Sequence, residues 1–139
     1  MACFWNGILK QLRQNKQNLP LLLQPIPNSP STFVKFIQSN NVKATNVEVN
    51  GIRLTEQQIN ETQDAIKNGY SPNKVNSGTL VSTFDPVLIL LCQLSEMNIN
   101  HKYMNNNIQY TYIKSEQKNN KTISPFTMNF GSNSGHFWG

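Results

Sequence analysis

The stretch DPVLILLCQL at residues 85–94 decides the fold of this chain. Aspartate followed by proline is typical of a helix start, because the carboxylate caps free N–H groups and proline fits the first helical position. The residues that follow are apolar on nearly every side, which predicts a helix buried at the centre of the protein. The other elements are expected to pack around this helix.

After this helix the sequence alternates between apolar and polar residues, which is typical of strands with one buried face. The alternating positions are Ile99, His101 and Tyr103, then Ile108, Tyr110 and Tyr112 beyond a hairpin at 105–107, then Ile123, Phe126, Met128 and Phe130, and last His136 and Trp138. Residues 115–122 are polar and predict a loop. The C-terminal part should therefore form an antiparallel sheet.

Before the central helix the signals are mostly helical. They predict a helix at 3–17, then a proline-rich connector and a short helix capped by Ser31 or Thr32. One or two strands within 42–54 turn at Asn50-Gly51, and the next helix opens with a capping box at 55–58. A surface loop at 69–81 follows and is long enough to shape a binding site. Helices first and strands last indicate an α+β fold in a single domain, residues 1–139.

The charge and composition of the chain argue against a nucleic-acid-binding function. The formal net charge is +5 and the pI is about 9.4, yet charged residues make up only 14% of the chain, whose mean hydropathy is -0.47. The lysines are scattered, whereas a nucleic-acid interface gathers its cations on one face beside exposed aromatics. We therefore expect a solvated surface, with no nucleic-acid partner.

The two cysteines are far apart in the sequence, and Cys92 lies inside the apolar helix, where a thiol packs as a small hydrophobe. A disulfide framework is not expected. Two distant histidines offer no metal-ligand spacing, so neither a metal nor another cofactor is expected. Without an apolar run of about 20 residues or a signal peptide, the sequence predicts a monomeric cytoplasmic protein with no membrane segment.

Cys3 and His136, near opposite ends of the chain, each lie in a setting that suits a cysteine-nucleophile site. Cys3 opens the first helix, where free backbone N–H groups favour a thiolate and are able to hold an oxyanion. His136 follows a loop of small residues at 131–135 and enters an aromatic strand. An imidazole there is placed to act as a general base.

These two ends resemble papain-like cysteine proteases, above all compact viral papain-like enzymes and ovarian-tumour-type (OTU) deubiquitinases. CFWNGILKQL at residues 3–12 is similar to the nucleophile helix of leader-type and nidovirus enzymes, and Gly135-His136-Phe137 resembles the step that carries their base. The order of the helix at 86–94, an Asn-rich hairpin and a final Gly-His strand also resembles OTU enzymes. The resemblance implies a domain of a viral, torovirus-like polyprotein in the host cytosol, or alternatively a bacterial OTU effector.

The sequence departs from these families at two places. An Asp, Asn or Gln usually precedes the cysteine and helps to form the oxyanion hole, but only Met1 and Ala2 precede Cys3 here. A third catalytic residue normally follows the histidine, where this chain has Trp138 and Gly139. Either flanking residues are missing, or the site is a dyad with an orienting group upstream, for which Asn129 and Asn133 are candidates.

The resemblance implies a substrate whose C-terminal tail ends in Gly-Gly preceded by arginines, as in ubiquitin. Such a tail needs a narrow channel and acidic contacts. The candidate substrate-binding residues are Trp5, Glu61, Asp64, Asp85, Gly131, Gly135, Phe137 and Trp138, and Asn6 is an oxyanion or orienting candidate. Local roles compete with several of these assignments, since Asp85 also serves as an N-cap and one of the three aromatics is expected in the core.

The resemblance thus implies a deubiquitinase that attacks the glycine carbonyl with Cys3, assisted by His136, and that also cuts its own viral polyprotein. Evasion of host innate immunity is the role that this resemblance implies. The alternative is a non-catalytic module on the same scaffold that binds ubiquitin, or binds RNA through its positive charge.

Overall fold

The computed structural model describes residues 3–69, 85–133 and 135–139. Most of the predicted loop at 69–81 lies outside these ranges. The helices are α1 (Cys3–Gln14), α2 (Pro30–Ser39), α3 (Glu56–Gly69) and α4 (Pro86–Ser95), with short 3₁₀ turns at Lys16–Asn18 and Leu21–Leu23. The strands are β1 (Val47–Val49), β2 (Ile52–Arg53), β3 (Asn98–Tyr103), β4 (Asn106–Gln117), β5 (Asn120–Ile123), β6 (Thr127–Ser132) and β7 (Phe137–Trp138). The fold is α+β, as predicted.

The strands form one sheet in the order β2-β1-β4-β3-β6-β7, and β5 pairs with the outer part of β4. The sheet is mixed, so the prediction of an antiparallel sheet is wrong at one place. β6 runs parallel to β3, with Asn98 opposite Thr127 and Tyr103 opposite Ser132. The reason is that β4 and β5 carry the chain away and back before β6 joins the free edge of β3.

Helix α4 is the centre of the fold, as its apolar sequence predicts. Its residues from Val87 to Cys92 are buried, and it packs against β1, β3 and β4 on one side and against α2 and α3 on the other. Asp85 caps the helix, since its Oδ1 accepts the Val87 N–H at 2.7 Å. The backbone N–H of Asp85 donates to the Tyr110 hydroxyl at 2.9 Å, which ties the start of α4 to β4.

Several local signals form as predicted. The turn between β1 and β2 has positive φ at both Asn50 and Gly51, the geometry that an Asn-Gly hairpin favours. The capping box of α3 is closed by two bonds, from the Thr55 N–H to Gln58 Oε1 at 2.9 Å and from the Gln58 N–H to Thr55 Oγ1 at 3.1 Å. The cap of α2 differs from the prediction, because Ser29 caps the helix and Pro30 opens it.

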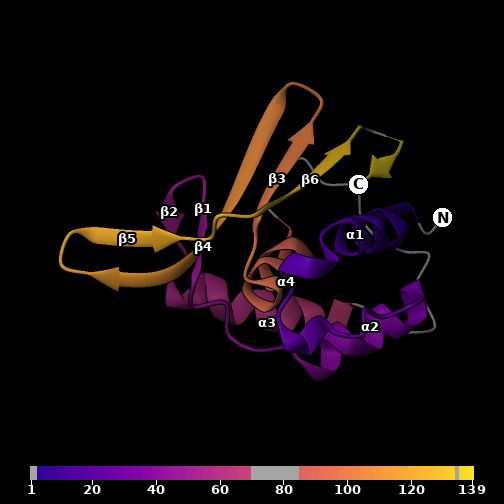
Figure 1. Cartoon of the computed structure of the whole chain (residues 1–139), viewed down its shortest axis with the longest axis horizontal. Helices are drawn as coiled ribbons and strands as arrows, with labels where there is room; N and C mark the ends of the chain where they lie inside the picture. The colour runs from indigo at the N-terminus through magenta and orange to yellow at the C-terminus, as the bar shows by residue number, and fades with distance from the viewer. Residues whose placement is uncertain (1–2, 70–84, 134) are drawn as a thin grey trace.

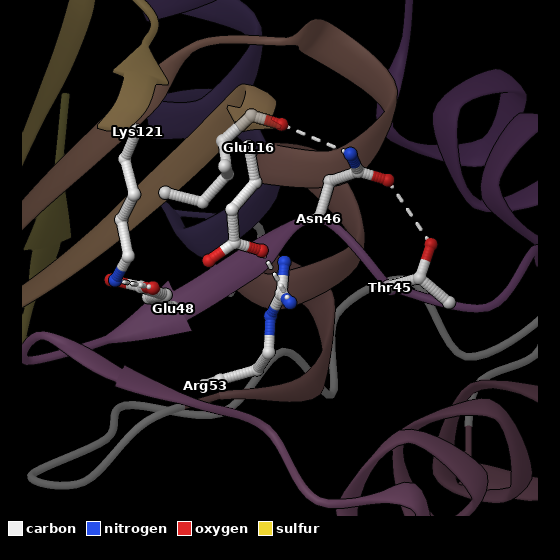
Figure 2. A network of polar contacts seen from close by, with 7 residues as sticks. Thr45, Asn46, Glu48, Arg53, Glu116 and Lys121 are labelled. Atoms are coloured by element: carbon white, nitrogen blue, oxygen red, sulfur yellow. Dashed lines mark hydrogen bonds and ion pairs between the residues drawn. The ribbon is translucent and has the colours of Figure 1, made fainter. Parts of the chain in front are cut away.

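The segment predicted as a polar loop at 115–122 forms a hairpin instead. β4 and β5 pair across it, and this arm extends away from the helices (Figure 1). Polar contacts hold the arm to β1 and β2: Arg53 Nη1 lies 2.8 Å from Glu116 Oε2, and Lys121 forms an ion pair with the nearly buried Glu48 (Figure 2). Asn46 adds a bond from its Nδ2 to the Ile113 carbonyl at 2.9 Å.

Helix α1 lies beside β6 and β7, so the two ends of the described chain meet (Figure 1). Gln11 Oε1 accepts the backbone N–H of Asn129 in β6 at 3.0 Å. The apolar face of α1, which includes Phe4, Trp5 and Leu12, is buried in the core. This packing positions the start of α1 next to the loop between β6 and β7.

Candidate active site

One face of α1 carries the candidate nucleophile. Cys3 is the first residue of the described helix and is half-buried, and its thiol is free. Asn6, Gly7 and Lys10 follow at intervals of three, four and seven residues, which places them along the same face. N–H groups at a helix start have no carbonyl partner within the helix, and those of the first described turn of α1 lie at the Cys3 end of this face.

The candidate base lies on the loop that joins β6 to β7. His136 is exposed, and its ring stacks on Trp138 with the centroids 5.6 Å apart and the planes at 21°. Asn133 shapes the loop with two bonds: its backbone N–H donates to the His136 carbonyl, and its Oδ1 accepts the Gly135 N–H, both at 2.9 Å. The loop is thus held by its own polar groups beside the imidazole.

Phe137 packs the strand that follows His136 against helix α1. Its ring is buried between Phe4 at 4.8 Å, Phe130 at 5.5 Å and His101 at 5.5 Å, measured between ring centroids. Gly7 makes this approach possible, because a Cβ added there would lie 2.9 Å from Phe137 Cδ1 and 3.1 Å from the Gly139 nitrogen. The glycine predicted only as part of a nucleophile motif is therefore the contact point between α1 and β7.

Cys3 and His136 line the same pocket, which has a volume of about 280 Å³. Its other lining residues are Asn6, Gly7, Lys10, Phe137, Trp138 and Gly139. The structure therefore brings together two residues that are more than 130 positions apart in the sequence. Of the predicted site residues, Asn6, Phe137 and Trp138 join them at this pocket.

The remaining residues predicted near the catalytic pair do not line this pocket. Trp5 is fully buried in the core, with its ring edge-on to Phe4. Asn129 is exposed on β6, and Asn133 and Gly135 belong to the loop that carries the base. Gly131 lies under the Trp138 ring, since a Cβ there would be 2.5 Å from two of its atoms. Gly131 thus supports the aromatic wall from beneath.

The three acidic candidates lie elsewhere. Glu61 lines a different pocket, between α3 and the start of α4, and Asp64 is exposed on α3. Asp85 is only 2% exposed and serves as the N-cap of α4. Burial raises the pKa of Asp85 to about 6, against the bonds from the Val87 and Leu88 N–H groups that lower it. As placed in the structure, none of the three contributes a carboxylate to the Cys3 pocket.

His101 is a buried structural histidine. Its Nε2 lies 2.7 Å from the Ser132 hydroxyl, and burial lowers the pKa of the imidazole. Its Nδ1 is buried and has no hydrogen-bond partner among the described residues. Because Ser132 pairs with Phe137 across β6 and β7, His101 supports the strand that leads away from the base.

Two residues at the site were missed by the sequence analysis. Lys10 lines the pocket, and the 8%-exposed Gln11 fastens α1 to β6 through the Asn129 N–H. Counting seven residues on from Cys3 along a helix would have found Lys10. No sequence signal marks Gln11, since its partner is a backbone group more than a hundred residues away.

No protein-family model, curated protein or solved structure matches this chain. In the described ranges no three His, Cys, Asp or Glu side chains gather where a metal ion would bind. No helix there has both the length and the apolar character that a transmembrane span requires. Function is therefore argued from the pocket itself.

Proposed function

We propose that this protein is a cysteine peptidase with Cys3 as the nucleophile and His136 as the general base. The observation that carries the proposal is the pocket that both residues line, at the start of a helix. A thiol, an imidazole and free helical N–H groups are the three parts that thiol-dependent acyl transfer needs.

In this mechanism His136 takes the proton of the Cys3 thiol, and the thiolate attacks the carbonyl carbon of the substrate. The N–H groups at the start of α1 stabilise the oxyanion. As the C–N bond breaks, the imidazolium gives its proton to the leaving amine and a thioester remains. His136 then takes a proton from water, the hydroxide attacks the thioester, and the acid is released with the thiol restored.

In this mechanism two residues orient the imidazole of His136. Trp138 stacks on the ring of His136, and Asn133 binds the backbone around it. Asn129 is left out, because it does not line the pocket. The site would thus operate as a dyad whose base is held by an aromatic face and by a rigid loop.

For the substrate we propose a narrow tail with glycine at the cleaved bond, as in ubiquitin or ubiquitin-like modifiers. The support for glycine at the cleaved bond is the resemblance of residues 3–12 and 135–137 to papain-like and OTU enzymes. Cleavage within a viral polyprotein would use the same chemistry at a glycine-containing junction.

The test is covalent capture by ubiquitin that carries a C-terminal propargyl group, in parallel with a glycine-ended peptide that carries the same group. Wild type should form an adduct, whereas Cys3→Ala should form none and His136→Ala should react far more slowly. Cys92→Ala is the matched control, since Cys92 is buried and burial raises the pKa of its thiol.

Each outcome separates the proposals. Capture of the peptide but not of ubiquitin supports the peptidase and refutes the ubiquitin substrate. Absence of both adducts refutes the peptidase, and salt-dependent RNA binding, or ubiquitin binding without reaction, would then identify a binding module. An adduct in Cys3→Ala would show that the wrong nucleophile has been assigned.

A further inference from the structure

The Cys3 pocket has a charge that the proposed function does not use. Lys10 lines it, is exposed, and forms no ion pair or hydrogen bond with any described residue. This distinguishes it from Lys121 and Arg53, which are paired with Glu48 on β1 and with Glu116 on β4. A cation that lacks a partner inside a candidate substrate pocket is available to the substrate.

No side-chain carboxylate of the described residues lies in the pocket with this cation. All seven acidic residues of the chain lie in described ranges, since residues 70–84 contain no Asp or Glu. Two are in ion pairs, Asp85 is buried as an N-cap, and the others are on α3 or at the end of α4: Glu48, Glu56, Glu61, Asp64, Asp85, Glu96 and Glu116. None of them lines the Cys3 pocket. Among the side chains that line the pocket, Lys10 therefore carries a positive charge without an acidic neighbour.

The position of Lys10 sets where it acts. Seven residues along a helix correspond to a rise of about 10 Å from Cys3. An extended peptide advances about 3.3 Å per residue. A substrate that ran along α1 from Cys3 would therefore bring a residue about three positions from the scissile bond level with Lys10.

We propose that Lys10 is a specificity-determining residue that selects substrates with an acidic side chain about three residues from the cleaved bond. The inference rests on the proposed peptidase and deepens it by naming the substrate class, an acidic peptide segment next to glycine. Of the two substrates proposed above, it favours a glycine-containing polyprotein junction over the ubiquitin tail, whose arginines before Gly-Gly would face Lys10 with no side-chain carboxylate nearby.

The experiment compares fluorogenic peptides with glycine at the cleaved bond and Glu, Gln or Arg three residues away, on either side of that bond. Each set is measured with wild type, Lys10→Gln and Lys10→Glu. Lys67→Glu is the matched control, because it makes the same change in net charge from an exposed position on α3. The measured quantity is kcat/KM for each peptide.

Wild type should prefer Glu over Gln by about two- to five-fold, the size expected for one exposed ion pair, and the preference should fall as salt rises. Lys10→Gln should abolish the preference, and Lys10→Glu should reverse it in favour of Arg. Lys67→Glu should keep the wild-type order. An equal preference in all four proteins, or an equal change in the control, overturns the role of Lys10.

A binding measurement keeps the two proposals distinguishable. Fluorescence anisotropy of the same labelled peptides with Cys3→Ala, alone and combined with Lys10→Glu, reports charge selection without any chemistry. Selective binding without cleavage by wild type supports the role of Lys10 and refutes the peptidase. Cleavage by wild type with equal affinity and equal kcat/KM for the Glu and Arg peptides supports the peptidase and refutes the role of Lys10.

Discussion

Replacing Gly7 with alanine tests the contact that joins the two halves of the candidate site. The added Cβ would lie 2.9 and 3.0 Å from two carbons of the Phe137 ring, well inside the 3.4 to 4 Å of ordinary contact. The ring is not free to swing away, because Phe4, Phe130 and His101 surround it. The strand that follows His136 must therefore move away from α1.

Two opposing free-energy contributions determine how much Gly7→Ala changes the stability of the protein. Alanine in a helix is about 1 kcal/mol more favourable than glycine, and overpacking a core position costs about 1–3 kcal/mol. The steric term should dominate because the obstacle is a rigid buried ring. We expect a loss of about 1 kcal/mol in the free energy of unfolding, and capture of Cys3 by the propargyl peptide at least tenfold slower, since small displacements of a base cost much rate.

Denaturant unfolding measures the first effect and the rate of adduct formation measures the second. Gly69→Ala is the control, because a Cβ there meets no atom of the described residues within 4 Å, and it should leave both quantities equal to or better than wild type. Adding Phe137→Leu to Gly7→Ala should cost less than the sum of the single changes, as a double-mutant cycle would show. Should Gly7→Ala prove as stable and as reactive as wild type, the argument that this glycine sets the distance between helix and base is wrong.

The other predictions concern the aromatic wall and the buried carboxyl. Gly131→Ala would place a Cβ 2.5 Å from the Trp138 ring, so the ring should leave its stack on His136. The tryptophan fluorescence should then change, and capture of Cys3 by the propargyl peptide should be slower. An unchanged fluorescence spectrum contradicts this prediction. The pKa of Asp85 is about 6 in the folded protein against 3.8 unfolded, so unfolding between these pH values releases a proton. The free energy of unfolding should therefore fall by about 2 kcal/mol as pH rises from 4 to 7. Asp85→Asn keeps the acceptor for the Val87 N–H and should remove this fall, and denaturant titrations of both proteins across that pH range check the sign.

Local sequence signals predicted much of the fold because their partners are close in the chain. Thr55 and Gln58 cap each other, Asn50 and Gly51 close a two-residue turn, and Asp85 caps its own helix. Each of these contacts joins residues at most three positions apart. Their energetics are therefore fully encoded in a short window of sequence.

The predictions from the sequence were wrong where contacts between distant residues determine the secondary structure or the strand pairing. The arm at 115–122 reads as a loop because it is polar, and it becomes a hairpin because Glu116 and Lys121 find charged partners on β1 and β2. The parallel pairing of β6 with β3 depends on which sheet edge remains free, which no local pattern reports.

The sequence marked the thiol and the imidazole of the candidate site, but it did not mark all the other residues that line the pocket. Cys3 at a helix start and His136 after a small-residue loop are visible in the sequence, and the structure brings both to one pocket. The acidic residues Glu61 and Asp64 were chosen from the expected substrate, so nothing in the sequence tied them to this pocket.

The seating of Phe137 against Phe4 has a consequence for synthesis on the ribosome. Of the described elements α1 is translated first, and the Phe137 ring that packs on Phe4 follows more than 130 residues later. Until then Phe4 lacks this partner, and the pocket that Cys3 lines is incomplete. The pocket would therefore form only when β7 packs against α1.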